Sequence, residues 1–452
     1  MSSMTIRVML PAFLLLAAAQ AVRAEKAIES AGYRYFMVQE KDGKVAEVLP
    51  LVEDTPPQWA KDVSRKKADW SGGPKADEAV FEGPIPFVIT PTDTGETFLK
   101  HNHQPSITWL DNGDLLAIWY TTGEEKGTEL TVLASRLRKG KHVWDPSSVF
   151  FKAPNRNMHG SGILRDDSGK LYHLNGMARE GAMGWDKLAF LMRTSIDHGV
   201  TWSQPVVAGP EYKGRQQIIS GGIINKQGVI LQNCDAVPGS EGGTALQIST
   251  DHGLTWSDPG AGKPTPDFKA GGTGEGTIAG IHAGIVELTD GRIMALGRGN
   301  SIDGKMPRSI SANLGKTWTY DASPFPPIGS GQRLVLKRLK EGPLLLVSFT
   351  SADRKQPRAT GLMFTDTKGG GYICYGMYAA LSLDDGKTWP YRRLLTPGSG
   401  TYDGGAWTST FTATPDQAEH AGYLACTQTP DGIIHLISSR LHYRFNLAWL
   451  KK

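Results

Sequence analysis

Five side chains suited to catalysis recur at one fixed distance before a predicted turn. Each stands eight positions before the acidic residue of that turn; the five are His103, His159, His282, Arg333 and Tyr423. Imidazole can act as a general base near neutral pH or bind a metal ion, and guanidinium binds carboxylates through paired hydrogen bonds. If the five positions converge, they form one site for an anionic ligand.

Two other interpretations of this ring of side chains stay open at the level of sequence. Three histidines could hold zinc, but the short spacings typical of zinc ligands are absent, so we predict no metal and no cofactor. The polar side chains of the ring could instead form hydrogen bonds with water trapped in a central channel.

The turns themselves indicate a repeated β-hairpin. Apolar, β-rich segments flank a turn that ends in glycine. The six turn glycines are Gly113, Gly169, Gly228, Gly291, Gly342 and Gly432. Six hairpins, each joining two inner strands, predict six repeated units of sheet. Plentiful glycine (54) and proline (27) suit a chain of many short strands and turns.

An octapeptide of a second kind lies between successive hairpins. Its four copies are Ser195–Trp202, Ser249–Trp256, Ser311–Trp318 and Ser382–Trp389. In each copy an Asp or Asn can accept hydrogen bonds from turn N–H groups, and a glycine supplies a positive φ. The closing tryptophan anchors the next strand. A degenerate fifth copy spans Ser135–Trp144.

This octapeptide is the Asp-box, or bacterial neuraminidase repeat, and residues 84–452 resemble the sialidase-like β-propeller proteins. The resemblance implies an all-β fold, a six-bladed β-propeller with four antiparallel strands per blade. We expect residues 25–83 to form an N-terminal extension that packs on the propeller or contributes to its closing blade.

The resemblance also implies roles for three of the residues. Sialidases hold the substrate carboxylate with three arginines and use a Tyr–Glu pair as nucleophile, with a loop Asp as acid/base. Arg298 and Arg333 match the second and third arginine, and Tyr423 matches the nucleophile. We therefore expect these two arginines to bind substrate.

Other family positions carry different residues. His103, followed by Gln104, occupies the place of the first arginine, and His282 occupies the place of the glutamate. We expect His103, His159 and His282 to stand in catalytically for the missing groups, with Gln104 binding substrate. The loop acid would come from Glu124, Glu125 or Glu129, since no Asp is present there.

Four loop residues complete the predicted site. Trp185 and Trp407 lie in glycine-rich loops and are suited to stacking on sugar faces, although core packing would explain them equally well. Asp235 and Asp403 are loop acids that could protonate a leaving group if they overhang the axis.

The sequence therefore predicts a secreted exo-acting glycoside hydrolase of sialidase type that acts on a glycan bearing sialic or uronic acid. A uronate-directed polysaccharide lyase that uses His, Tyr and Arg would need nearly the same residues. A non-catalytic, lectin-like propeller would keep the fold and the stacking loops. No basic tract accompanies the small net charge of +4, so nucleic acid is not an expected partner.

The N-terminus has the pattern of an export signal. Arg7 precedes an apolar run, and Val22-Arg-Ala24 offers small residues for cleavage, so residues 1–24 are predicted to be a signal peptide. The run is too short for a comfortable membrane anchor, and no later stretch has transmembrane length. We expect a secreted or periplasmic protein. Whether Cys374 pairs with Cys426 is left open.

Overall fold

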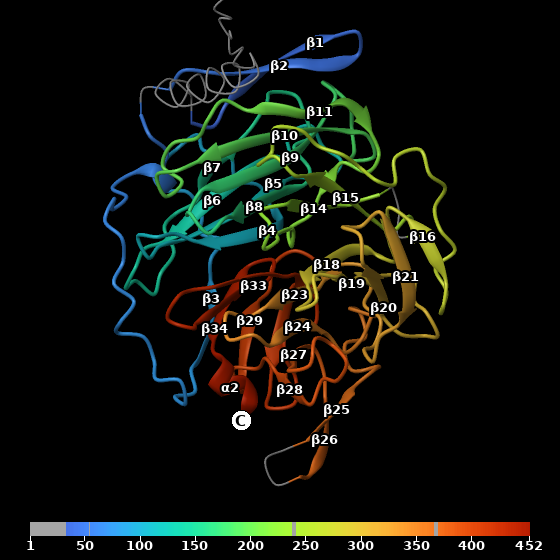
Figure 1. Cartoon of the computed structure of the whole chain (residues 1–452). Helices are drawn as coiled ribbons and strands as arrows, with labels where there is room; N and C mark the ends of the chain where they lie inside the picture. The colour runs from blue at the N-terminus through green and yellow to red at the C-terminus, as the bar shows by residue number, and fades with distance from the viewer. Residues whose placement is uncertain (1–32, 54, 237–240, 366–368) are drawn as a thin grey trace, which may run out of the picture.

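The chain folds into six antiparallel sheets arranged as the blades of a propeller (Figure 1). The computed structural model describes residues 33–53, 55–236, 241–365 and 369–452. It confirms the predicted six-bladed β-propeller with four antiparallel strands as the basic blade. The predicted signal peptide, residues 1–24, lies outside the described residues.

The blades follow one another along the chain, and the strands of each are named from the axis outward. Blade 1 contains β4 (His101–Trp109), β5 (Leu115–Thr122), β6 (Thr131–Leu137) and β7 (Ser148–Phe151). Blade 2 contains β8 (Ser161–Arg165), β9 (Leu171–Ala178), β10 (Leu188–Ser195) and β11 (Val206–Lys213). Blade 3 contains β12 (Gln217–Ile218), β13 (Ile223–Ile224), β14 (Ile230–Asp235), β15 (Thr244–Ser249) and β17 (Thr277–Ile278).

The second half of the chain repeats this order. Blade 4 contains β18 (Ile281–Glu287), β19 (Ile293–Arg298), β20 (Pro307–Ser311), β21 (Thr317–Ala322) and, on its edge, β16 (Thr273–Glu275). Blade 5 contains β23 (Val335–Arg338), β24 (Leu344–Phe349), β27 (Met377–Ser382) and β28 (Tyr391–Leu394). Blade 6 contains β32 (Ala425–Gln428), β33 (Ile434–Ile437), β34 (Leu441–Phe445) and β3 (Phe81–Pro86).

Smaller elements join or decorate the blades. Two short strands pair in parallel, β22 (Gln332–Arg333) with β31 (Gly422–Tyr423). Two further hairpins are β25 (Leu362–Thr365) with β26 (Gly371–Cys374), and β29 (Gly400–Asp403) with β30 (Thr410–Ala413). The helical turns are η2 (Gln58–Ala60) and α2 (Leu447–Lys451).

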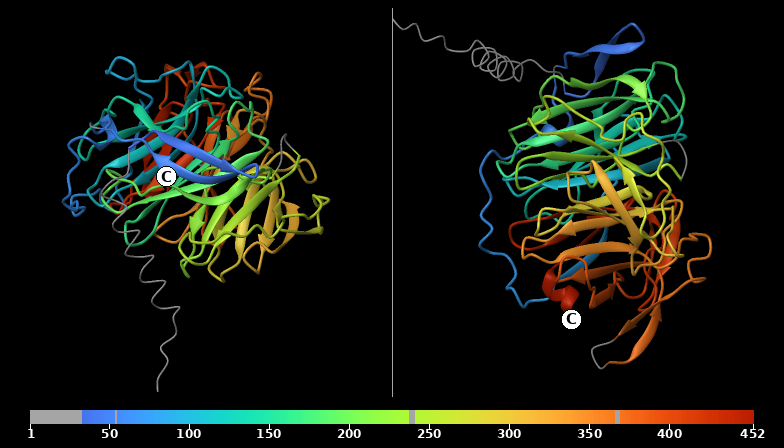
Figure 2. Two further views of the ribbon diagram at one scale, coloured as in Figure 1. Left: turned by 90° about the horizontal axis from the view of Figure 1, so that it is seen from above. Right: turned by 45° about the vertical axis from the view of Figure 1, so that its right-hand side comes forward.

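The N-terminal region is built into the propeller at two places. β3 pairs with β34, with Phe81 opposite Phe445, so a strand from the start of the chain completes the last blade. The hairpin of β1 (Phe36–Lys41) and β2 (Lys44–Pro50) extends the outer edge of blade 2 through β11. Figure 2 shows this hairpin over blade 2 and the following segment running down the outside of the molecule toward α2. Pairing both ends of the chain in one sheet closes the ring.

The four octapeptides form turns that follow the third strand of blades 2 to 5. In blade 3, Oδ1 of Asp251 accepts the backbone N–H of Thr255 at 2.9 Å, and Oδ2 accepts the Thr255 hydroxyl at 2.6 Å. Oγ of Ser249 accepts the N–H of Gly253 at 2.7 Å, and Gly253 has φ +93°. The equivalent Asp or Asn makes the same backbone contact in the other three copies. The side chains thus specify the turn, as the sequence predicts.

The core lies between the blades. All residues of β5 and of β24 are buried, because each blade packs against a neighbour on both faces. This explains continuous apolar runs such as Leu344–Val347 where a half-exposed strand would alternate. Cys234, Cys374 and Cys426 are all free thiols, so Cys374 and Cys426 do not pair.

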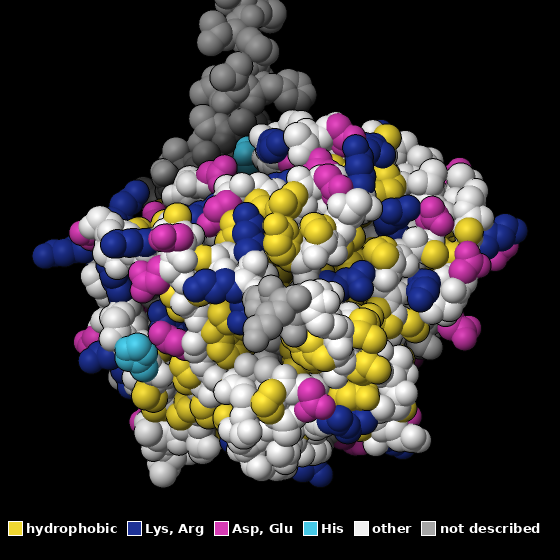
Figure 3. All heavy atoms as spheres, turned by 90° about the horizontal axis from the view of Figure 1, so that it is seen from below, with side chains coloured by type: hydrophobic (Ala, Val, Ile, Leu, Met, Phe, Trp, Pro, Cys, Tyr) yellow, Lys and Arg dark blue, Asp and Glu magenta, His cyan; other side chains and the backbone are white. Residues whose placement is uncertain are grey.

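The surface carries both signs of charge. On the face shown in Figure 3, Lys and Arg side chains are interspersed with Asp and Glu and with exposed hydrophobic side chains. Within the described part of the chain, no helix combines the length and the apolar character needed to cross a membrane.

Candidate functional site

In five of the six blades the inner strand is interrupted at the level of the predicted ring; in blade 2, β8 begins two residues after His159 and is regular. The register of β4 shifts between His103 and Ser106, and that of β18 shifts between Ile281 and Gly284. In blades 3, 5 and 6 the inner strand stops and restarts at this level, giving β12 and β13, β22 and β23, and β31 and β32. Bulges and breaks of this kind re-aim side chains away from the regular pleat. They turn the ring residues toward one another.

Tyr423 lies at the centre of the resulting cluster. Its hydroxyl oxygen is 2.8 Å from Nε2 of His282 and accepts a hydrogen bond from Nη1 of Arg298 at 3.0 Å. The ring centroids of His103 and Tyr423 are 3.9 Å apart. Because β22 pairs with β31 in register, Arg333 lies beside Tyr423, with its Cζ 5.2 Å from the ring. The structure therefore brings together four of the five ring residues around one phenol.

Asp235, at the end of β14, holds His282 through two contacts. One carboxylate oxygen accepts the backbone N–H of His282 at 2.7 Å, and the other lies 2.7 Å from Nδ1 of its ring. Burial lowers the pKa of His282 to about 4, and the charge of Arg298 acts in the same direction. Burial raises the pKa of Asp235, but the contacts with His282 outweigh it, so the net shift is downward. Asp235 is thus an ionised partner of His282.

The two arginines have different surroundings. Arg333 is fully buried and donates from Nε to Leu424 O at 3.1 Å and from Nη2 to Pro105 O at 2.6 Å. Burial lowers its pKa to about 10. Arg298 is partly exposed and donates from Nη1 to Gln332 O at 3.1 Å as well as to Tyr423. Of the two, Arg298 is the more accessible to a substrate.

Four buried polar atoms of the ring residues and of Gln104 have no hydrogen-bond partner among the described residues; they are Nε2 of His103, Nδ1 of His159, Oε1 of Gln104 and Nη1 of Arg333. A fifth, Nδ1 of His282, has only its 2.7 Å contact with the Asp235 carboxylate, which is not aligned as a hydrogen bond. Gln104 adopts φ +55° and donates to Ile218 O at 3.2 Å. Buried polar groups are nearly always satisfied, so unpartnered ones grouped in one place point to a bound ligand or water.

Glu125 organises the side of the cluster formed by blade 1. Its Oε1 accepts the Tyr120 hydroxyl at 2.8 Å, lies 3.1 Å from Nε2 of His101, and accepts Nε1–H of Trp407 at 3.3 Å. Burial raises the pKa of Glu125, but the contacts with His101, Tyr120 and the nearby histidines outweigh this and place it well below the usual range. Glu125 is therefore a carboxylate in the free protein.

The other two glutamates of this loop face elsewhere. Glu124 is exposed. Glu129 folds back onto its own turn and accepts the backbone N–H of Gly123 at 3.0 Å.

His159 and Trp185 form a second side of the site. The two rings stack with centroids 4.9 Å apart, and the Tyr120 ring is 5.2 Å from His159 on blade 1. The Gln217 amide donates to Nε2 of His159 at 2.9 Å. Burial lowers the pKa of His159 to about 4. The indole of Trp185 thus already stacks on an imidazole.

Asp403 lies apart from these groups. Its side chain is exposed, pairs with Arg440 at 3.0 Å, and accepts the N–H of Gly405 at 3.0 Å. Trp407, four residues later on the same loop, reaches the cluster instead: its ring is 5.7 Å from His101 and 6.4 Å from His103.

Three residues of the site were not singled out from the sequence. Tyr120 pairs in register with His103 across the first hairpin, so the turn count that identified one could have identified the other. Ser439 lies in the turn between β33 and β34 and bonds both His103 and Tyr423. Glu419 is buried near Gly422, the residue before Tyr423, accepts the Tyr443 hydroxyl at 2.8 Å, and has its pKa raised to about 8 by burial. No local sequence signal marks Ser439 or Glu419.

The histidines do not converge on one point as metal ligands would. His103, His159 and His282 each have a separate protein partner. In the part of the chain that the structure describes, no three His, Cys, Asp or Glu side chains are grouped to hold a metal ion.

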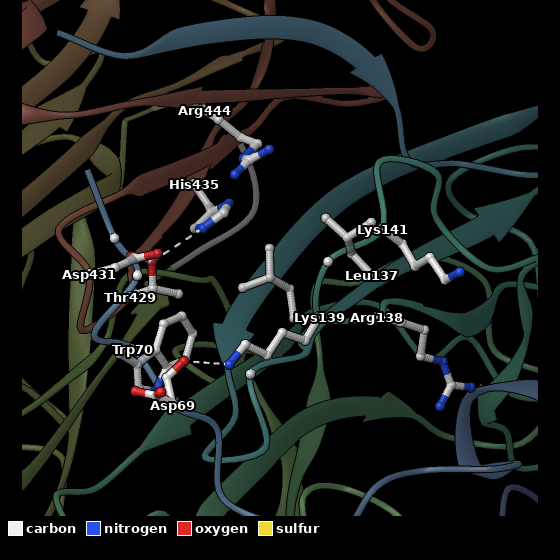
Figure 4. A pocket seen from close by; sticks show the side chains of 15 residues that line it. Asp69, Trp70, Leu137, Arg138, Lys139, Lys141, Thr429, Asp431, His435 and Arg444 are labelled. Atoms are coloured by element: carbon white, nitrogen blue, oxygen red, sulfur yellow. Dashed lines mark hydrogen bonds between the residues drawn. The ribbon is translucent and has the colours of Figure 1, made fainter. Parts of the chain in front are cut away.

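A separate cavity of about 260 Å³ lies at the other end of the hairpins, between the N-terminal segment, blade 1 and blade 6. Figure 4 shows its lining, in which the ammonium of Lys139 bonds the carbonyl of Asp69 beside Trp70. His435 and Asp431 lie across from them, both close to Thr429. None of the residues predicted for catalysis lines this cavity.

Comparison with known proteins places the chain among related propellers. A sialidase of Micromonospora viridifaciens is 23% identical over 417 residues, which cover 84% of this chain and 57% of that protein. A Streptococcus pneumoniae sialidase structure matches with a TM-score of 0.52 and 14% identity, covering 81% of this chain and 71% of its own. A Dyadobacter fermentans protein of unknown function matches with a TM-score of 0.50 and 15% identity, covering 81% and 99%. At these identities the solved structures support the fold.

The family comparison is more direct. The description "BNR repeat-like domain" matches residues 113–436, from the first hairpin turn to the second strand of blade 6. Since this segment spans well over half of the sequence, the chain belongs to the family of BNR repeat-like domain proteins.

Proposed function

We propose that this protein is a glycoside hydrolase of sialidase type that removes a carboxylate-bearing sugar, a sialic or uronic acid, from the end of a glycan. The observation that carries the proposal is the Tyr423 hydroxyl held between His282 and Arg298. The similarity to a curated sialidase supports the reaction class.

In the proposed reaction Tyr423 is the nucleophile. Nε2 of His282 takes the phenol proton as the oxygen attacks the anomeric carbon, and Asp235 stabilises the imidazolium that forms. Arg298 lowers the cost of charge on the phenolate. Burial raises the pKa of Tyr423 and the charge of Arg298 opposes that rise. An adjacent base is therefore needed for Tyr423 to react near neutral pH.

The substrate carboxylate would face the cationic side of the cluster. Arg298 and Arg333 supply two positive charges close to Tyr423. Nη1 of Arg333 and Nε2 of His103 are donor positions without a protein partner. Guanidinium groups suit carboxylates because their N–H groups match the spacing of two oxygens.

The leaving oxygen would take its proton from the His101–Glu125 pair. The two groups share a hydrogen bond on the blade 1 side of the cluster, and both are partly exposed. Asp403, exposed and paired with Arg440, is less suited to this role. Attack by Tyr423 followed by hydrolysis of the glycosyl–tyrosine bond gives retention of the anomeric configuration.

The test is an assay that identifies the product from sialylated and uronate-containing glycans. The proposal expects a free, saturated acidic sugar, and expects Tyr423→Phe to abolish its release. An unsaturated product, detected by its ultraviolet absorbance, would instead identify a lyase. Binding without any product would identify a lectin-like protein.

Export is a second part of the proposal and rests on the predicted signal peptide. N-terminal sequencing of protein recovered outside the cytoplasm should begin at Glu25. A start at Met1 in that fraction would contradict it.

A further inference from the structure

Ser439 touches two members of the catalytic cluster at once. It is fully buried in the turn between β33 and β34. Its Oγ lies 2.9 Å from Nδ1 of His103 and 3.3 Å from the backbone nitrogen of Tyr423. One hydroxyl therefore links the strand that carries the proposed nucleophile to the histidine packed against its ring.

The hydrogen atoms at this point can be assigned by counting donors. The amide N–H of Tyr423 can only donate, so Oγ of Ser439 accepts that bond. The single hydroxyl hydrogen of Ser439 is then available, and the acceptor within reach is Nδ1 of His103. Ser439 Oγ makes no third hydrogen bond to the described residues. A proton on Nδ1 would therefore leave the buried hydroxyl hydrogen of Ser439 without an acceptor, at a cost.

We propose that Ser439 is a positioning residue that holds His103 as the tautomer with its hydrogen on Nε2, which makes His103 a hydrogen-bond donor to the substrate. Nε2 is buried, has no protein partner, and belongs to a ring packed against Tyr423. The donor would serve an acceptor oxygen of the sugar, with the carboxylate as the favoured group because Arg333, whose Cζ is 5.2 Å from the Tyr423 ring, also has an unpartnered donor there. The assignment of that oxygen rests on the proposed function; the tautomer does not.

His282, the second histidine beside Tyr423, is held as the opposite tautomer. The carboxylate of Asp235 can only accept, so Nδ1 of His282 carries the hydrogen and Nε2 is left to accept the Tyr423 hydroxyl. Two imidazoles thus flank one phenol in opposite tautomers. His282 is set to take a proton, and His103 is set to give a hydrogen bond.

The surroundings of His103 keep it neutral. Burial lowers its pKa well below the usual range; Glu125 opposes this, whereas the charges of His101, Arg333 and His282 add to it. A neutral imidazole with one fixed N–H is a donor across the working pH range. The neutral imidazole of His103 thus stands where the sialidases that this chain resembles carry a charged arginine.

The tautomer can be measured without any substrate. In protein labelled with ¹⁵N-histidine, long-range ¹H–¹⁵N correlation spectra distinguish a protonated from an unprotonated Nδ1, and His103→Gln identifies the signals. We expect unprotonated Nδ1 and protonated Nε2 for His103. Protonated Nδ1 in the wild-type protein would overturn the inference, whether or not any glycan is cleaved. If the tautomer is as expected but no glycan is cleaved, only the proposed function fails.

Kinetics test what the tautomer is for. Ser439→Ala should raise KM about 3- to 10-fold, the worth of one hydrogen bond, and Ser439→Thr should restore it because threonine keeps the hydroxyl. Ser148→Ala removes a buried hydroxyl from an outer strand of blade 1 and should leave KM unchanged. Combining Ser439→Ala with His103→Ala should be no worse than His103→Ala alone. If the effects of Ser439→Ala and His103→Ala on KM are fully additive, or if Ser148→Ala raises KM as much as Ser439→Ala does, then Ser439 does not act through His103.

Discussion

Nε2 of His282 lies 2.8 Å from the hydroxyl oxygen of Tyr423, and Nδ1 of the same ring lies 2.7 Å from a carboxylate oxygen of Asp235. The three side chains come from blades 6, 4 and 3, so the contact exists only when the ring of blades is closed. A buried carboxylate, an imidazole and a hydroxyl in this order are the groups that we propose activate Tyr423 as a nucleophile.

Removing the base should cost most of the activity. We expect His282→Ala to lower kcat about 10²- to 10⁴-fold, the usual contribution of a general base, with a smaller change in KM. Asp235→Asn should act in the same direction because it no longer stabilises the imidazolium. Steady-state kinetics check this, with circular dichroism to confirm folding. A His282→Ala protein that keeps wild-type kcat would contradict the assignment.

The pH dependence should reveal the depressed pKa of His282. The base must be neutral to accept a proton, so kcat/KM should fall only as the pH drops below about 4. An acid limb near 6.5, the value for an ordinary histidine, would argue against His282 as the base.

The pH dependence of the free energy of unfolding is the control for the pH dependence of kcat/KM. Histidines such as His159, with pKa about 4 when folded, bind fewer protons than in the unfolded chain between pH 4 and 6.5. The free energy of unfolding should therefore be greatest above pH 6.5 and fall as the pH decreases toward 4. Urea titrations at pH 7 and pH 5 measure this, and rates are compared only where the protein is folded.

Two neighbouring glutamates provide a matched test of the acid/base side. Glu125 makes three hydrogen bonds in the cluster, whereas Glu124 is exposed. Glu125→Gln should lower kcat about 10²-fold or more, and Glu124→Gln should change it less than about twofold. Equal effects of the two substitutions on kcat would remove Glu125 from the mechanism.

Alanine substitutions at two glycines of blade 4 distinguish the cost of a steric clash from the cost of backbone strain. Gly280 and Gly291 both have positive φ, +82° and +85°. A Cβ at Gly280 would lie 2.8 Å from the carbonyl oxygen of Arg298, whereas one at Gly291 would meet open space. We expect Gly291→Ala to cost about 1 kcal/mol of unfolding free energy and Gly280→Ala to cost roughly 2 to 4 kcal/mol. Urea unfolding measures both.

The Gly280 substitution should also disturb the site, because the clash displaces the strand end that carries Arg298. A raised KM in Gly280→Ala but not in Gly291→Ala is the expected result. Equal unfolding free energies for the two variants would contradict the close contact.

The sequence predicted the blade number and the ring because both follow local rules. The ring residue stands eight positions before the acidic turn residue in five of the blades, so one count located His103, His282, Arg333 and Tyr423 together. The octapeptides specify their turns through side-chain hydrogen bonds within four residues. Interactions between residues this close in the sequence can be predicted without a structure.

Contacts between blades could not be predicted in the same way. Asp235 looked like a free loop acid, yet it ends a strand of blade 3 and binds a histidine of blade 4. Ser439 and Glu419 have no motif, and their contacts with His103 and with Tyr443 appear only in the folded chain. Asp403 has the residue type and the loop position expected of a catalytic acid, but its side chain pairs with Arg440. The catalytic roles of the cluster stay predictions until activity is measured.

The central claim is that Tyr423 attacks the sugar. The most direct test treats the protein with a fluorinated glycosyl fluoride of the acidic sugar that it cleaves, which slows release of a glycosyl–enzyme intermediate, and then sequences the labelled peptide by mass spectrometry. The account predicts one added sugar on Tyr423 and none in Tyr423→Phe. A sugar bound to another residue, or turnover of the reagent with no labelled peptide, would contradict it.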